Sequence, residues 1–345
     1  MIISKYNSQK IKVLNLVLIM MVVYIHSYYL EEENGYPIAL GLQNIMSGWG
    51  LCCVGNTAFF LLSGFLFFNG ILSAQDCFPK MKKRVHSLLV PYLIWNVIFI
   101  LWYVVLQNLP GIGGYINSDM VGSLTKNGLL DALRVLYWEP ANFPLWFVRD
   151  LMFMVAVSPL LYYLIKYLKW FTPILLVAIS PFVNIHVSPF FILGGCIAMH
   201  SSLEKVHKIT NGEGIFWSST FIYVANAIAQ VFTDYHHPYL TFVVCLCGII
   251  TVSRLYDWIA SNQSLTSKLT PLNSLLGYSF FIYLFHEPVF NIIKKIGLKV
   301  LGVHEWSLIL LYLINPLIMC AIAIMVAKLL QRFVPKVYSV LVGGR

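Results

Sequence analysis

Two histidines and a glutamate lie in stretches of the chain that are otherwise apolar enough to span a lipid bilayer. His26 falls in one such stretch near the N-terminus, and His286 and Glu287 are adjacent in another near the C-terminus. Ionisable side chains are costly in hydrocarbon, so they normally face a bundle interior or a wet cavity and indicate a functional site. An imidazole titrates near neutral pH, which suits it to act as a general base. The three residues are predicted to belong to a functional site inside a membrane protein.

The two histidines are expected at nearly the same depth in the membrane. His26 lies about fifteen residues into an expected helix at 11–30, and His286 about thirteen residues into one at 273–296 that enters from the same side. Matched depth on separate helices favours a shared site. Two alternatives stay open: His26 only forms a hydrogen bond with a neighbouring helix, or the His-Glu pair only locks the bundle.

Further polar residues share the helix face of His26. Asn15 precedes His26 by eleven residues, which is three helical turns on nearly the same face, and Lys12 lies close to this stripe. One face of the expected helix therefore offers polar groups from its inner end to the outer leaflet.

An adjacent Arg149 and Asp150 open the expected helix at 143–165. Arg149 stays charged and must find an anion, a carbonyl or a sugar hydroxyl, so a structural ion pair and a substrate clamp are equally compatible with it. Trp146 shares the face of Asp150, and its indole suits either an interfacial belt or stacking on a pyranose ring.

The expected helix at 48–71 combines polar and small residues with phenylalanines. Asn56, Thr57, Ser63 and Gly64 lie in this segment. Small residues let helices approach closely, so the pattern first indicates packing.

A basic patch formed by Lys82, Lys83 and Arg84 precedes the expected helix at 87–108. Such patches usually anchor a helix at the inner face of the membrane. The alternative is a site for a phosphate-bearing cytosolic donor, because Arg and Lys are the usual phosphate partners.

Composition defines the broad class of the protein. The chain of 345 residues is 59% hydrophobic and 11% charged, which is typical of a polytopic helical membrane protein rather than a soluble one. Its net charge of +9 comes from basic residues between apolar spans, so no nucleic-acid partner is expected.

The seven cysteines show no metal or disulfide spacing, and no metal or bound cofactor is predicted. There is no Walker, GxGxxG, HExxH or GxSxG motif.

Hydropathy predicts an all-α fold with about ten transmembrane helices in a single domain over 1–345. The expected spans are 11–30, 48–71, 87–108, 143–165, 170–185, 188–200, 214–232, 238–260, 273–296 and 306–333. The fifth and sixth are short and bounded by prolines, so they also fit one broken hairpin.

Basic residues predict that both termini lie on the inner side of the membrane. Lysines and arginines gather on the side of the N-terminus, whereas the opposite side holds the acidic run Glu31 to Glu33 and a long loop at 109–142. The main exceptions on the outer side are Lys294, Lys295 and Lys299.

Several of these segments together resemble the acyltransferase-3 family of integral-membrane acyltransferases, over residues 10–333. The resemblance rests on KVLNLVLIMMVVYIHS, FFLLSGFLFF, KKRVHSLLVPYLIWN, PLWFVRDL and YLFHEP, in this order. It implies transfer of a short acyl group from cytosolic acyl-CoA to a hydroxyl or amine of a glycan or lipid-linked acceptor.

The resemblance also implies roles for individual residues. His26 matches the histidine regarded as the catalytic base of the family. The family usually has an arginine eleven positions earlier, where this chain has Asn15. Lys12 supplies the missing charge, or donor binding differs, or activity is weak or lost. Ser63, Gly64, Trp146, Arg149, Asp150 and His286 stand where the family pattern has similar groups.

The sequence therefore predicts a multi-pass O-acyltransferase of a bacterial inner or plasma membrane, acting first of all as an acetyltransferase on a cell-surface or capsular glycan precursor. Acetyl-CoA or another acyl-CoA is the expected co-substrate, with a succinyl donor as the close variant. The assigned donor-binding residues are Lys12, Asn15, Lys82, Lys83 and Arg84, the acceptor-binding residues are Trp146, Asp150, Asn56 and Ser63, and the catalytic residues are His26, Arg149, His286 and Glu287. Membrane lipid is the other expected partner, and a homo-oligomer stays open. The rival functions are a transporter of polysaccharide or a small anion and a non-catalytic partner in glycan assembly.

Overall fold

The computed structural model of the chain consists of helices joined by short connections. It describes residues 3–30, 35–108, 134–183, 187–233, 236–262 and 270–344, and these contain no β-strand. The prediction of an all-α fold is confirmed. The run Glu31 to Glu33 and most of the predicted outer loop at 109–142 lie outside the described residues.

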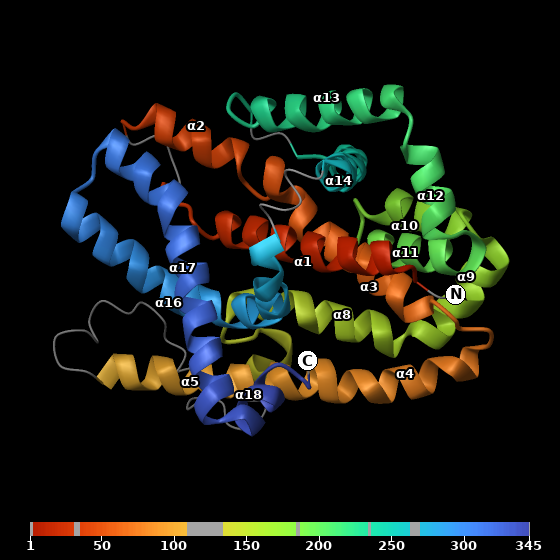
Figure 1. Cartoon of the computed structure of the whole chain (residues 1–345), viewed down its shortest axis with the longest axis horizontal. Helices are drawn as coiled ribbons and strands as arrows, with labels where there is room; N and C mark the ends of the chain where they lie inside the picture. Colours follow the sequence, from red (N-terminus) through yellow and green to blue (C-terminus); the bar gives the residue numbers. More distant parts are fainter. Residues whose placement is uncertain are drawn as a thin grey trace.

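The N-terminal part of the chain includes α1 and α3, which lie at the centre of the molecule (Figure 1). It contains α1 (Lys5–Ile25), α2 (Pro37–Ile45), a 3₁₀ turn at Leu51–Cys53, α3 (Val54–Phe68), a 3₁₀ turn at Ala74–Asp76, α4 (Cys77–Arg84), a π-helical turn at Val85–Leu89 and α5 (Val90–Asn108). Helix α1 begins where the Ser4 side chain accepts a hydrogen bond from the Asn7 amide at 3.2 Å, a regular N-cap. It packs against α3 and against three C-terminal helices, α14, α16 and α17. Residues on α1 are therefore placed to meet both halves of the chain.

The middle of the chain forms shorter helices. They are a π-helical turn at Arg134–Trp138, a 3₁₀ turn at Phe143–Leu145, α8 (Trp146–Ala156), α9 (Ser158–Leu168), α10 (Phe171–Ile179), α11 (Ser188–His200), α12 (Leu203–Thr210) and α13 (Glu213–Ala229). Helices α8 and α9 are bent by 67° at Val157, just before Pro159, which cannot continue the hydrogen-bond ladder of α8.

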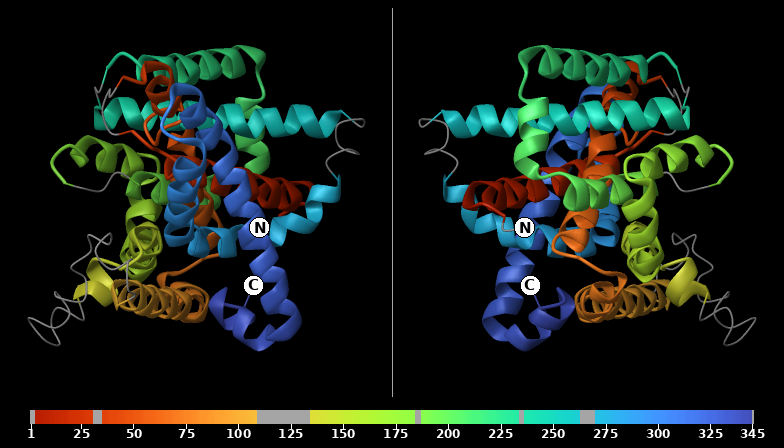
Figure 2. Two further views of the ribbon diagram at one scale, coloured as in Figure 1. Left: turned by 90° about the vertical axis from the view of Figure 1, so that its left-hand side faces the viewer. Right: turned by 90° about the vertical axis from the view of Figure 1, so that its right-hand side faces the viewer.

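The C-terminal part contains the longest helices. They are α14 (Pro238–Ser261), a 3₁₀ segment at Thr270–Tyr278, α16 (Ser279–Leu301), α17 (Glu305–Phe333) and α18 (Pro335–Leu341). Helices α13 and α14 lie at one end of the molecule, and α5 and α18 lie at the opposite end (Figures 1 and 2). A proline in the first turn begins α14 and α18, where its missing N–H costs no helical hydrogen bond.

Each of the ten predicted spans contains a helix, but the helices differ in length. Among the described residues, five helical stretches are long and apolar enough to cross a membrane, and the bent pair α8–α9 makes a sixth if it counts as one span. These five are Lys5–Ile25, Leu51–Phe68, Ala74–Asn108, Pro238–Ser261 and Glu305–Phe333. The chain is thus a polytopic membrane protein. The number of ten spans and the inner position of both termini stay predictions.

Helices α3 and α11 approach each other closely because a glycine on each helix faces the backbone of the other helix. A Cβ atom at Gly64 would lie 1.9 Å from the Phe191 carbonyl oxygen, and one at Gly194 would lie 2.0 Å from the Leu61 carbonyl oxygen. Only glycine fits at either position without moving a backbone. The packing expected from Ser63 and Gly64 is therefore present, and it fixes the helix that carries Asn56 and Ser63.

Candidate active site

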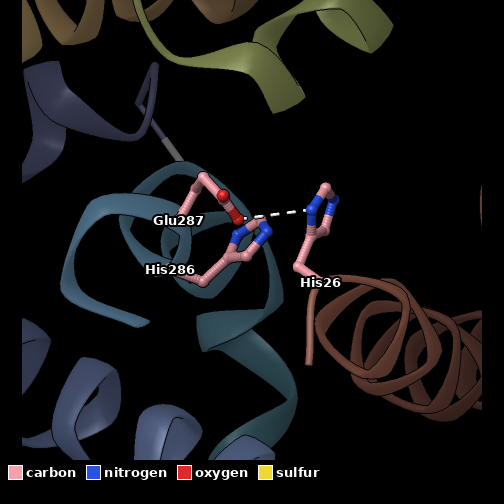
Figure 3. A group of neighbouring side chains, drawn as sticks. All are labelled: His26, His286 and Glu287. Carbon is pink, nitrogen blue, oxygen red and sulfur yellow. Dashed lines mark ion pairs between the residues drawn. The ribbon is translucent and has the colours of Figure 1, made fainter. Parts of the chain in front are cut away.

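His26, His286 and Glu287 come together where α1 ends against α16 (Figure 3). The two imidazole centroids are 5.1 Å apart, and Nδ1 of His26 lies 3.2 Å from Oε2 of Glu287. The side chains of His26 and Glu287 are only 14% and 20% exposed. The juxtaposition expected from matched depth is present. A carboxylate beside Nδ1 favours the tautomer that leaves Nε2 of His26 free to accept a proton.

Hydrogen bonding within this group is incomplete. Nδ1 of His286 donates to the Tyr283 carbonyl at 2.7 Å, which leaves Nε2 of this fully buried imidazole as an acceptor. Among the described residues, neither Nε2 of His286 nor Oε2 of Glu287 has a hydrogen-bond partner. The contact of Glu287 with His26 is therefore within ion-pair distance but not aligned as a hydrogen bond. Catalytic hydrogen bonds are often loose in an empty site and tighten when substrate binds.

Two further residues of α16 hold the group in place. Nδ2 of Asn291 donates to Oε1 of Glu287 at 3.2 Å. Nζ of Lys294 donates to the His26 carbonyl at 3.0 Å and lies 4.9 Å from the centroid of the Tyr28 ring. This carbonyl follows the last residue of α1, where helical carbonyls lack partners and a positive charge is favourable. Lys294 thus fixes the backbone that carries the His26 side chain.

A cavity of about 200 Å³, here called the inner cavity, is lined by Asn15, Ile19 and Val22 of α1. Its polar lining residues are Asn15, Asn56, Ser63, Arg84, Ser279 and Tyr283. The Arg84 guanidinium makes no hydrogen bond or ion pair with any described residue. An arginine without a partner in a largely apolar cavity calls for an anionic ligand.

An outer cavity of about 500 Å³ contains His26. Aromatic and imidazole rings make up much of its lining, namely those of Trp49, Phe143, Trp146, Phe190, His236, His237 and Phe242. No Asp, Glu, Lys or Arg occurs among the described residues that line it. The outer cavity therefore differs from the inner one in charge as well as in size.

Asn56 lines both cavities and therefore lies between them. Along α1 the lining passes from Asn15 in the inner cavity to His26 in the outer one, a rise of about 16 Å at 1.5 Å per residue. Among the described residues, the Asn56 amide has no hydrogen-bond partner. Its position between the cavities makes it available to a reacting group that spans both.

Other predicted site residues lie apart from these cavities. Nε of Arg149 donates to Asp150 at 2.8 Å, and its guanidinium lies 5.7 Å from the Trp138 ring centroid. Neither Arg149 nor Asp150 lines the inner or the outer cavity. Lys12, Lys82 and Lys83 are exposed and line neither cavity. The structure thus brings together His26, His286 and Glu287, and separately Asn15, Ser63 and Arg84, with Asn56 between them and Trp146 on the outer side.

The group at His26 also offers donors for a metal ion. One atom each from His26, His286 and Glu287 lies within 4.8 Å of the others, and two imidazoles with a carboxylate suit a divalent ion such as Zn²⁺. The sequence analysis predicted no metal, and the acid–base role proposed below uses the same three side chains without one.

A family model described as an acyltransferase domain matches residues 9–328, nearly the whole chain. The chain belongs to this acyltransferase family. The resemblance drawn from the sequence is thereby confirmed, and the chain is a multi-pass membrane acyltransferase. The succinoglycan biosynthesis protein ExoH of Rhizobium meliloti (strain 1021) is 26% identical over 350 residues, covering 98% of this chain and 92% of the relative. No solved structure matches the chain.

Four residues around the site were not predicted from the sequence, namely Asn291, Lys294, Trp49 and His236. Lys294 was treated only as an exception to the charge asymmetry, although Glu287, Asn291 and Lys294 repeat at i, i+4 and i+7 on one helix face. Trp49 and His236 come from distant segments with no shared pattern, so no sequence signal connects them.

Proposed function

We propose that the protein transfers an acyl group from cytosolic acyl-CoA to a hydroxyl of a cell-surface glycan or its lipid-linked precursor, in a bacterial plasma membrane. The observation that carries this proposal is that Asn56 lines two unlike cavities, one containing Arg84, which has no partner among the described residues, and the other containing His26. An anionic donor and a polar, uncharged acceptor would then meet from opposite sides. The acyltransferase family of the chain and the role of its relative in succinoglycan biosynthesis support this division.

Acyl-CoA would bind through Arg84 in the inner cavity, with Asn15 beside it and the exposed Lys82 and Lys83 attracting its phosphates from outside. Arg84 supplies a positive charge to the cavity that Asn15 lines, so the arginine expected at position 15 is replaced from α4. Lys12 is not needed for this role. Acetyl is the first acyl group to test and succinyl the second.

The chemistry follows from His26. Nε2 of His26 takes the proton of the acceptor hydroxyl while the hydroxyl oxygen attacks the thioester carbonyl carbon. The resulting oxyanion accepts a hydrogen bond from the amide of Asn56. The C–S bond then breaks and the thiolate of coenzyme A leaves. His26 passes the proton that it took from the acceptor hydroxyl to the sulfur of this thiolate. Glu287 stabilises the imidazolium through Nδ1, and His286 packs beside the ring to keep its orientation.

The test is transfer of label by the full-length protein in lipid nanodiscs. Acetyl-CoA and succinyl-CoA carrying ¹⁴C in the acyl group are supplied with deacylated succinoglycan fragments, and the His26→Ala variant gives the background. Label should appear in the glycan with one of the two donors only when His26 is present. Absence of His26-dependent label with both donors would contradict the proposal, and donor or glycan crossing sealed vesicles without covalent transfer would instead favour a transporter.

A further inference from the structure

The rim of the outer cavity carries a pair of stacked rings that the proposed chemistry does not use. The rings of Trp49 and His236 are parallel within 15°, with centroids 4.3 Å apart. Both residues line the cavity that contains His26, and Trp49 is 44% exposed. Flat rings with polar edges, facing a cavity beside a reactive group, suit a ligand that has both an apolar face and hydroxyl groups.

The turn that carries Trp49 is held firmly. Nδ2 of Asn226 donates to the Trp49 carbonyl at 2.8 Å. The Ser47 hydroxyl accepts from the amides of Trp49 and Gly50 at 3.3 Å and 3.1 Å. A Cβ atom at Gly50 would lie 2.1 Å from the Ile45 carbonyl oxygen, so no other residue fits the turn. A platform that is already fixed loses little conformational entropy when a ligand binds.

The charge of the cavity indicates which ligand it takes. The described residues that line it include no carboxylate, lysine or arginine, so apart from its three imidazoles it offers no cationic partner to phosphate or carboxylate groups. Its volume of about 500 Å³ lies within the range of roughly 300 to 1,000 Å³ that small-molecule sites occupy. Trp146 and Phe143 line it from another segment, and the Phe143 ring lies edge-on 6.5 Å from that of His26.

We infer that Trp49 and His236 form the platform on which a neutral pyranose ring of the acceptor stacks, with the hydroxyl to be acylated directed toward His26. This inference rests on the proposed function and adds the position and the class of the acceptor subsite. The alternative role for Trp49 is that of an aromatic residue at the membrane interface. Trp306 provides the matched control, since it is 74% exposed at the start of α17 and lines none of the described cavities.

The experiment compares Trp49→Ala, Trp49→Phe, His236→Ala and Trp306→Ala in nanodiscs. Transfer from labelled acyl-CoA to deacylated succinoglycan fragments gives KM for each substrate, and saturation-transfer NMR with cellobiose reports binding directly. Trp49→Ala should raise the acceptor KM about 3- to 10-fold, the usual worth of one ring contact, with turnover and the acyl-CoA KM unchanged. His236→Ala should do the same, Trp49→Phe should keep most of the affinity, and Trp306→Ala should have no effect.

Two results separate the failure of this inference from the failure of the proposed function. If the wild-type protein acylates the fragments and Trp49→Ala keeps the wild-type acceptor KM, the inferred stacking platform is wrong and the proposed acyl transfer is supported. If the wild-type protein transfers no label but the cellobiose signal is lost in Trp49→Ala and kept in Trp306→Ala, the platform stands and the transfer is wrong. An absent cellobiose signal together with an unchanged KM in Trp49→Ala overturns the inference.

Discussion

Two groups of ionisable residues interrupt apolar segments of this membrane protein, and they differ in how completely their hydrogen bonds are satisfied. The pair Arg149 and Asp150 is closed, because the guanidinium donates to the neighbouring carboxylate at 2.8 Å. The group of His26, His286 and Glu287 is open, because two buried polar atoms in it have no hydrogen-bond partner among the described residues. A buried polar group without a partner costs roughly 1–3 kcal/mol, so it needs an explanation, and a ligand or a reaction supplies one where the group borders a cavity, as His26 does.

The difference shows that the rarity of charge in a membrane identifies candidates but does not rank them. Hydrogen-bond satisfaction together with a place in a cavity separates them. By this criterion Arg84 belongs with the open group, because its guanidinium has no partner among the described residues and lines the inner cavity. The same criterion groups Arg149 with residues that hold the fold, and the catalytic role predicted for it from the sequence stays a prediction.

Removal of the base should have the largest effect. His26→Ala should lower the rate of acyl transfer by a factor of roughly 100 to 10,000, the usual contribution of a positioned general base. Acyl-CoA binding and thermal stability should persist, because Arg84 and the packing of α1 are unchanged. The measurement is label transfer in nanodiscs with a thermal melt in parallel, and full transfer by His26→Ala would rule out the catalytic assignment.

Loss of the unpartnered arginine should come next. Arg84→Gln should raise the KM for acyl-CoA about 10- to 100-fold with a smaller change in turnover, because a charge-assisted hydrogen bond to the donor is lost in ground and transition states alike. Lys83→Gln is the control, since Lys83 is exposed and lines neither cavity, and it should change KM less than about 2-fold at physiological salt. Equal changes of the acyl-CoA KM in the two variants would mean that the basic patch only anchors the helix at the membrane.

Removing the support of His26 should have an intermediate effect. Lys294→Met deletes the hydrogen bond to the His26 carbonyl and should lower turnover about 5- to 10-fold by misplacing the imidazole, with the acyl-CoA KM unchanged. The adjacent Lys295 is exposed, so Lys295→Met is a matched loss of charge that should leave turnover unchanged. Similar turnover in both variants would mean that Lys294 serves only membrane orientation.

The closed pair should show the smallest effect on chemistry. Arg149→Ala should reduce thermal stability, because it leaves the Asp150 carboxylate without its partner, while turnover per folded molecule stays within about 3-fold of wild type. A 100-fold loss of turnover with an unchanged melting temperature would show that Arg149 acts on substrate and that hydrogen-bond satisfaction is a poor criterion here.

Local patterns in the sequence predicted the helices and the residues with unusual chemistry. Apolar runs located a helix in each expected span, and their polar interruptions identified His26, His286 and Glu287. The partner of Arg149 stayed open, because an ion pair and a substrate clamp place the same residue types at the same positions. The stacking of Trp49 on His236 and the junction at Asn56 depend on contacts between distant segments, which no local period encodes.

The most direct test of the central claim is a double-variant cycle on the two histidines. Residues that act as one unit lose most activity at the first removal and little more at the second. We predict that the double variant with His26→Ala and His286→Ala transfers label no more than about 3-fold more slowly than His26→Ala alone, although His286→Ala by itself is clearly impaired. If the two losses simply multiply, the histidines act independently and the open group at the end of α1 is not a catalytic unit.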